Sequence, residues 1–348
     1  MRTLRPTALL IAACALWAAC TGDLQPRPQI AQLRVLAMRM EPPEAVPGQQ
    51  VQAEALIVEP YGGGWTTTWY LCHTPVSFDE FFAGDLDASA GLCGDLDQPF
   101  GELIGTGNSV SFEVPEDYLD DVAEMLVAEG IVQTPDEAMG FLFFFGWHLR
   151  INMVVERDDG SDRIEGHKRL VINAFAGTNT NPEPPSIHMQ AVIEDGYNEY
   201  PAEQQAPPEP GECLVPGSSH TTFERGQSYV LTPVNLPEEP ETFERPDFTG
   251  EYVELTETRW FSWFSTAGPD PGGSMWEEKD PKGLDEPITN AEVASVIFAT
   301  GTPNDTELLV GDGGAPYLPI WVVMRDGRGG VSWCRQDVPY VDVPEDGE

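Results

Sequence analysis

Acidic residues around Cys93 form the sequence pattern with the clearest potential for metal chemistry. Asp85 and Asp87 precede this cysteine, and Asp95 and Asp97 follow it. Carboxylate oxygens are hard ligands that suit calcium, so the two pairs predict a calcium site. Neither pair fits an EF-hand loop, and the chain has 58 Asp and Glu residues in all. The alternative interpretation is that these carboxylates only solvate the surface.

The histidines and serines show no pattern that is typical of catalysis. None of the five histidines lies in an HExxH sequence, the helical spacing with which metalloproteases bind zinc. The chain also lacks a GxSxG nucleophile elbow and a phosphate-binding P-loop. We therefore expect no enzymatic activity, with a secreted hydrolase as the remote alternative.

The charge of the chain restricts its partners. Lys and Arg number 18 against 58 Asp and Glu, which gives a formal net charge of −40. Binding to DNA or RNA needs a basic surface, so no nucleic-acid partner is expected. The same charge argues against docking on anionic lipid through a basic face. An envelope protein or a glycan remains as the expected kind of partner.

The N-terminus has the features of a secretory signal. Residues 1–5 are basic, and residues 9–19 are entirely apolar and end in small residues. This apolar stretch is too short for a permanent transmembrane helix. It continues into Ala19-Cys20-Thr21, which resembles the lipobox of bacterial lipoproteins. The resemblance implies that Cys20 carries lipid and anchors the protein in a membrane, at the outer membrane or the cell surface.

Two departures leave alternatives open at this anchor. Trp17 stands where the lipobox usually has Leu. Cys14 follows a better consensus, but it leaves a very short apolar segment before it and an apolar one behind it. A further alternative is an ordinary signal peptide with free cysteines. We predict Cys20 as the lipidated residue.

Alternating and apolar segments predict strands along most of the remaining chain. Residues 51–58 alternate apolar and polar side chains, the period of a half-buried strand. Asp158–Asp162 separates two strand-like runs and predicts a hairpin turn. Three blocks of similar sequence occur in the same order in both halves, beginning at Gly48, Thr67 and Val154 and again at Gly226, Thr258 and Val322. This order predicts two copies of one fold, with Trp69 matched to Trp260.

Each copy, with several short strands, a Trp on the presumed third strand and a closing hairpin, resembles an immunoglobulin-like (PKD-like) domain. The resemblance implies an all-β fold of two tandem immunoglobulin-like β-sandwiches. Whole chains of this type resemble uncharacterised bacterial lipoproteins. The expected organisation is a signal peptide (1–19), a tether (20–32), a first sandwich (33–177), a linker (178–185) and a second sandwich (186–344).

Three further segments carry expectations. Residues 117–129 place apolar side chains on one face before Gly130, which predicts a short helical insertion in the first sandwich. Phe141–Trp147 is apolar throughout and predicts a buried strand, and residues 73–108 are expected to form an acidic, Gly-rich insertion. Trp260–Phe264 is rich in aromatic residues; one face is expected in the core, and the other packs elsewhere in the protein or binds a glycan or partner.

The remaining cysteines predict disulfides. Cys72, Cys93, Cys213 and Cys334 are an even set in an exported chain. Of the three pairings, the division into two sandwiches favours Cys72–Cys93 and Cys213–Cys334. The sequence thus predicts a lipid-anchored envelope protein with a non-catalytic binding or structural role. The alternative is a calcium-dependent adhesion module.

Overall fold

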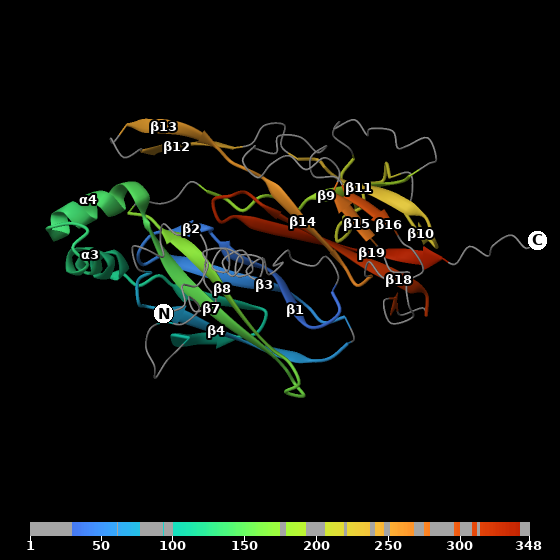
Figure 1. Ribbon diagram of the computed structural model, residues 1–348, viewed down its shortest axis with the longest axis horizontal. Helices are drawn as coiled ribbons and strands as arrows, with labels where there is room; N and C mark the ends of the chain where they lie inside the picture. The colour runs from blue at the N-terminus through green and yellow to red at the C-terminus, as the bar shows by residue number, and fades with distance from the viewer. Residues whose placement is uncertain are drawn as a thin grey trace, which may run out of the picture.

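The chain forms two β-sandwiches that follow one another along the long axis of the molecule (Figure 1). The computed structural model describes residues 30–60, 62–76, 93, 100–174, 179–192, 206–218, 221–236, 241–246, 251–267, 275–278, 296–299, 308–311 and 314–341. The first sandwich contains β1 to β8, and the second contains β9 to β19. In the described part of the chain, neither helix is long and apolar enough to cross a membrane.

The first sandwich pairs a three-stranded sheet, in the order β1-β3-β6, with a five-stranded sheet, in the order β2-β8-β7-β4-β5. Its strands are β1 (Arg34–Glu41), β2 (Glu44–Ala45), β3 (Gln50–Val58), β4 (Trp65–Cys72), β5 (Glu102–Thr106), β6 (Ser109–Glu113), β7 (Trp147–Arg157) and β8 (Arg163–Ile172). All neighbours are antiparallel except β2 and β8, which run parallel. If the two-residue β2 is set aside, one sheet holds the first, second and fifth strands and the other holds the third, fourth and last two. This separation is the immunoglobulin arrangement.

Trp69 on β4 fills the centre of the first sandwich. It is 0% exposed and belongs to a core built from both sheets and from the inner side of the helices. Its indole Nε1 donates to the Gly107 carbonyl oxygen over 2.7 Å, so the polar atom of this buried ring has a partner. Trp69 thus lies on the third long strand, as predicted, and the structure places its side chain in the core.

The second sandwich repeats this arrangement. Its two sheets have the orders β15-β16-β11-β9 and β10-β19-β18-β14, and β17 pairs with β18. Its strands are β9 (Ser186–Ala191), β10 (Phe223–Glu224), β11 (Ser228–Val234), β14 (Trp260–Ser265), β15 (Met275–Glu278), β16 (Val296–Ala299), β17 (Leu309–Val310), β18 (Pro316–Arg325) and β19 (Val331–Val341). A hairpin of β12 (Thr242–Pro246) and β13 (Tyr252–Thr256) projects toward the first sandwich (Figure 1). The all-β class with tandem sandwiches is confirmed.

The helical insertion consists of two helices, and the second corrects an expected strand. The first, α3 (Tyr118–Ala128), lies where the amphipathic pattern predicted it. The second, α4 (Pro135–Phe145), includes most of Phe141–Trp147, which was wrongly assigned to a strand. The reason is local: Thr134 caps the helix by accepting from the Glu137 amide, and the Glu137 carboxylate accepts from the Gln133 amide. This capping box commits the segment to a helix before its aromatic run begins.

The insertion expected at residues 73–108 contributes a strand to the sheet, because β5 lies within this range and pairs antiparallel with β4. The match between Trp69 and Trp260 is wrong. Trp260 is 38% exposed, whereas Trp263 on the same strand is buried in the second core. A strand alternates its side chains between two faces, so a match shifted by an odd number of residues exchanges core for surface.

Both expected hairpins are present at the ends of the sandwiches. Strands β7 and β8 pair over their length around the turn at Asp158–Asp162. Strands β18 and β19 pair in the same way around Asp326–Gly330.

The structure also holds two disulfides, Cys72–Cys93 and Cys213–Cys334, and each lies within one sandwich.

Candidate functional site

A third hydrophobic cluster joins the two sandwiches. It is separate from the two sandwich cores and takes residues from β1 and β3 on one side and from β14, β18 and β19 on the other. Its buried members are Ile30, Leu36, Ala37, Val58, Phe264, Trp321, Val323 and Val331. Burial of apolar surface on both partners makes this junction a stable interface rather than a flexible connection.

Strand β18 contributes side chains both to the core of the second sandwich and to the junction cluster. Ile320 and Val322 face its own core, while Trp321 and Val323 face the first sandwich. The strand is therefore buried on both faces from Leu318 to Met324. The sequence of a strand that is buried on both faces is a continuous apolar run instead of an alternation of apolar and polar residues. Leu318–Met324 is such a run, and it is the feature of the sequence that indicates the interface.

Hydrogen bonds cross the same junction in both directions. Lys168 Nζ on β8 donates to the Gly329 carbonyl oxygen over 2.7 Å. Arg325 Nη2 on β18 donates to the Leu36 carbonyl oxygen over 3.2 Å. The expected linker takes part as well, because Asn181 donates to the Met40 carbonyl oxygen and accepts from the Val331 amide. The connection between the sandwiches is thus held by both of them.

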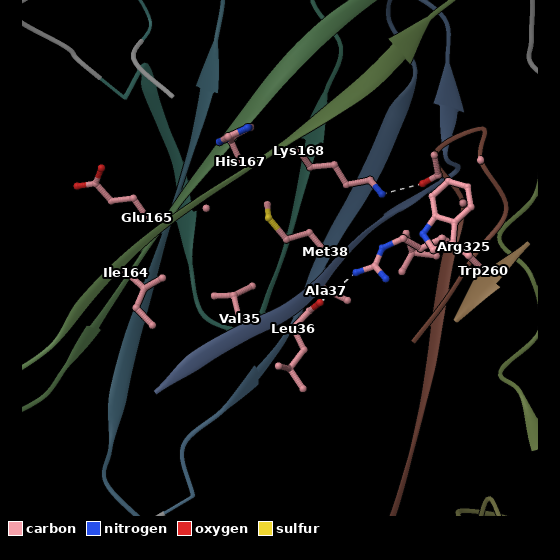
Figure 2. A pocket seen from close by; sticks show the side chains of 15 residues that line it. Val35, Leu36, Ala37, Met38, Ile164, Glu165, His167, Lys168, Trp260 and Arg325 are labelled. Carbon is pink, nitrogen blue, oxygen red and sulfur yellow. Dashed lines mark hydrogen bonds between the residues drawn. The ribbon is translucent and has the colours of Figure 1, made fainter. Parts of the chain in front are cut away.

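A groove of about 530 Å³ opens beside this junction. Its first wall is formed by β1 and β8, and its second by β14, the end of β18 and the following turn (Figure 2). The turn comes close to the aromatic wall at Gly327, which has φ +82°; a Cβ there would lie 3.3 Å from the Trp260 ring. A glycine is therefore required at this position both for the backbone and for the space.

Two cations determine the electrostatics of the groove. Burial, followed by the nearby charge of Arg325, lowers the pKa of Lys168 to about 8, although Asp326 acts in the opposite direction. Burial also lowers the pKa of Arg325. Both shifts have the same physical cause, since removal from water disfavours the charged form. The groove therefore presents positive charge in a strongly acidic protein.

A second group of charges lies on the other side of the β18–β19 turn. Arg328 bridges the sandwiches, with Nη2 3.1 Å from Glu44 Oε1 and Nη1 3.3 Å from Glu257 Oε1 and 3.5 Å from Glu241 Oε1. Its guanidinium also lies 4.2 Å from the centre of the Phe243 ring, on the projecting hairpin. This cluster connects β2 of the first sandwich with three segments of the second.

Glu257 gives this charge cluster a pH dependence. Burial, together with Asp326 and Glu241, raises the pKa of Glu257 from 4.5 to about 7, against the opposing effect of Arg328. Between these two values the unfolded chain ionises the carboxyl group while the folded chain keeps it protonated. The contribution of Glu257 to stability is therefore complete below pH 4.5 and is lost as the pH rises to about 7. Chemical unfolding across this range is expected to show the fall.

The matched variants for this prediction are Glu257→Gln and Glu254→Gln. The first keeps a neutral side chain at all pH values, so its stability should fall less between pH 5 and pH 7 than that of the wild type. The second removes an exposed carboxylate on β13 and should leave the profile unchanged. Identical profiles for the wild type and Glu257→Gln would contradict the assignment.

Several residues singled out by sequence lie outside the described residues. These are the lipidation candidates Cys20 and Cys14 and the calcium candidates Asp85, Asp87, Asp95 and Asp97. Among the residues that are described, no group of three or more His, Cys, Asp or Glu side chains is placed to hold a metal ion. The calcium prediction therefore remains untested.

The aromatic segment on β14 divides as its alternation requires. Phe261 and Trp263 belong to the second core, Phe264 packs in the junction, and Trp260 faces the groove. Sequence reasoning missed Lys168 and Arg325 as site residues. No local pattern marks them, since their positions are 157 residues apart (325 − 168) and only the junction brings them together.

No protein-family profile matches the chain, and no curated protein matches it. Similar solved structures include the fibronectin(III)-like modules of Clostridium thermocellum CbhA, at 8% identity and a TM-score of 0.20, with 90% of this chain and 98% of that chain covered. Murine CEACAM1b is similar at 8% identity and a TM-score of 0.19, with 90% and 100% covered. SGBP-B of the Bacteroides ovatus mixed-linkage glucan utilization locus, in complex with a heptasaccharide, is similar at 9% identity and a TM-score of 0.19, with 90% and 48% covered. At these TM-scores the similarities carry no argument about this chain.

Proposed function

We propose that this chain is a lipid-anchored protein of the cell envelope whose two sandwiches act as one non-catalytic binding or structural unit. The observation that carries the proposal is the junction, where a buried apolar cluster and reciprocal hydrogen bonds hold the sandwiches together. A fixed pair of domains presents one composite surface at a constant geometry, which favours recognition or support over independent motion.

The position of Ile30 limits how far the junction can lie from a lipid on Cys20. This residue is buried in the junction, and its amide donates to the Ser265 carbonyl oxygen over 2.7 Å. Nine residues separate it from Cys20, so the chain between them spans at most about 35 Å. A lipid on Cys20 therefore keeps the middle of the molecule, including the groove, near the membrane surface.

Replacing Cys20 with Ala tests the anchor. The wild-type protein is expected in the membrane fraction, and the Cys20→Ala variant in the soluble fraction, because no other residue would carry the lipid. Cell fractionation followed by immunoblotting measures the distribution. Cys14→Ala is the matched control and should remain with membranes. Continued membrane attachment of a Cys14→Ala, Cys20→Ala double variant would rule out lipid anchoring at either cysteine.

A further inference from the structure

Lys168 and Arg325 meet in one corner of the groove from different sandwiches. Figure 2 shows the two side chains reaching into the same space beside the Trp260 ring. Lys168 donates to the Gly329 carbonyl oxygen, and Arg325 donates to the Ser262 hydroxyl over 3.1 Å and to the Leu36 carbonyl oxygen. Every one of these acceptors is neutral. The hydrogen bonds therefore orient the two cations without compensating their charge.

No carboxylate forms a direct ion pair with the two cations among the described residues, although Asp326 acts on Lys168 from a greater distance. Glu165 is an exposed residue that lies at the other end of the groove and points away in Figure 2. Asp326 is close enough to raise the pKa of Lys168, but it forms no ion pair with either cation, and its Oδ1 accepts from the Arg328 and Gly330 amides at 2.8 and 2.9 Å.

Both cations keep donors for a bound anion. A guanidinium has five N–H groups and an ammonium has three. The hydrogen bonds above use two of the former and one of the latter. Charge-assisted hydrogen bonds from such groups to a carboxylate are roughly twice as strong as neutral ones. In a chain with 58 acidic and only 18 basic residues, a pair of cations without acidic partners is an exception that a bound anion would explain.

Apart from Glu165 and His167, the remainder of the groove lining is apolar and suits a ring. Trp260 is 38% exposed, and Val35, Met38 and Ile164 line the surface toward the other end. The groove volume of about 530 Å³ lies within the range of sites for small ligands. An exposed indole face packs well against the C–H face of a sugar. The ligand that fits both parts has a carboxylate at one side and a flat, partly apolar body at the other.

We propose that this groove binds an acidic sugar, with the carboxylate of a uronic-acid unit between Lys168 and Arg325 and the sugar ring against Trp260. The inference rests on the proposed binding role and is independent of the lipid anchor. A peptide C-terminus offers a carboxylate as well, but it lacks the sugar face and serves as a competing probe.

Calorimetric titration of the purified full chain tests the proposal. The probes are glucuronate, glucose, inorganic phosphate and N-acetylalanine. Glucuronate is expected to bind at least about tenfold more tightly than each of the others, because only glucuronate offers both the carboxylate and the sugar face. No binding of glucuronate overturns the site. Equal binding of phosphate or N-acetylalanine overturns the assignment to a sugar.

Three variants locate the binding in the groove. Lys168→Met removes a charge-assisted contact and should weaken glucuronate binding by about tenfold or more. Trp260→Ala removes a partly exposed side chain that belongs to none of the hydrophobic clusters, and it should weaken glucuronate binding severalfold. Arg163→Gln is the matched control, since it removes an exposed cation from the same strand, β8. Unchanged affinity in both Lys168→Met and Trp260→Ala contradicts the proposal.

A pH titration separates a binding role of Lys168 from a structural one. The charged groups near its ammonium are Arg325 and Asp326, and the pKa of Lys168 is lowered to about 8. Glucuronate binding by the wild type should therefore weaken as the pH rises through this value, and the Lys168→Met variant should lack that dependence. If the proposed sugar site fails while Cys20→Ala still releases the protein, the anchored envelope protein stands and only the groove assignment is lost.

Discussion

A Trp321→Ala variant is expected to lose about 3–5 kcal/mol of unfolding free energy and to melt in two steps instead of one. Trp321 is 1% exposed and lies at the centre of the junction cluster, on the face of β18 opposite the second core. Removing the indole leaves a cavity between the sandwiches but leaves both sandwich cores intact. The sandwiches should then unfold independently, because the surface that couples them has lost its largest side chain.

Differential scanning calorimetry distinguishes the two melting behaviours. Trp333→Ala is the matched control, since Trp333 lies on β19 at the edge of the same cluster and is only partly buried. It should lower stability by less and keep a single transition. One unchanged transition in Trp321→Ala, at nearly the wild-type temperature, would mean that the junction contributes little. The proposal of a rigid two-sandwich unit would then fail.

Removing the Cys213–Cys334 disulfide is expected to have the other large effect. The two cysteines are 121 residues apart in the sequence. A crosslink that closes a loop of this length restricts the unfolded chain strongly, by about 4–5 kcal/mol in the chain-entropy account. In the folded chain it ties the segment before β10 to the last strand. There, Gln336 Oε1 also accepts from the Cys213 and Leu214 amides. A Cys213→Ala, Cys334→Ala variant should therefore unfold at a much lower urea concentration.

The Cys72–Cys93 disulfide supplies the comparison within the same protein. Its cysteines are only 21 residues apart, which gives an expected contribution of about 3 kcal/mol. Urea unfolding of the two double-alanine variants under identical conditions measures the difference. A Cys72→Ala, Cys93→Ala variant that is less stable than the Cys213→Ala, Cys334→Ala variant would contradict this order. Mass mapping of the unreduced wild type should recover both pairs.

Local rules explain which elements the sequence predicted correctly. The hairpin turns at Asp158–Asp162 and Asp326–Gly330 contain the Asp and Gly residues that reverse a strand, and both hairpins are present. The amphipathic segment before Gly130 forms α3. The apolar run Phe141–Trp147 predicted a strand, but Thr134 and Glu137 ahead of it carry the spacing of a helix N-terminus and the run continues that helix. In this segment the start signal decided the structure.

The site depended on information that local patterns do not contain. The sequence left open which face of Trp260–Phe264 lies in the core, and the pairing between strands placed Trp263 there and turned Trp260 toward the groove. Lys168 and Arg325 lie in separate hairpins, and each lies where its strand meets the other sandwich. Only the docking of two outer sheet faces brings these positions together.

The sequence by itself determined the all-β class, the order of two similar sandwiches and the closing hairpins, because strand periodicity and turn chemistry act over a few residues. The tertiary structure decided the junction and the groove. Contacts such as Arg325 to Leu36 join residues 289 positions apart. They form because Trp321 and its neighbours bury a second face of β18 against the first sandwich, and the hydrophobic effect that drives this burial has no directional code in the sequence.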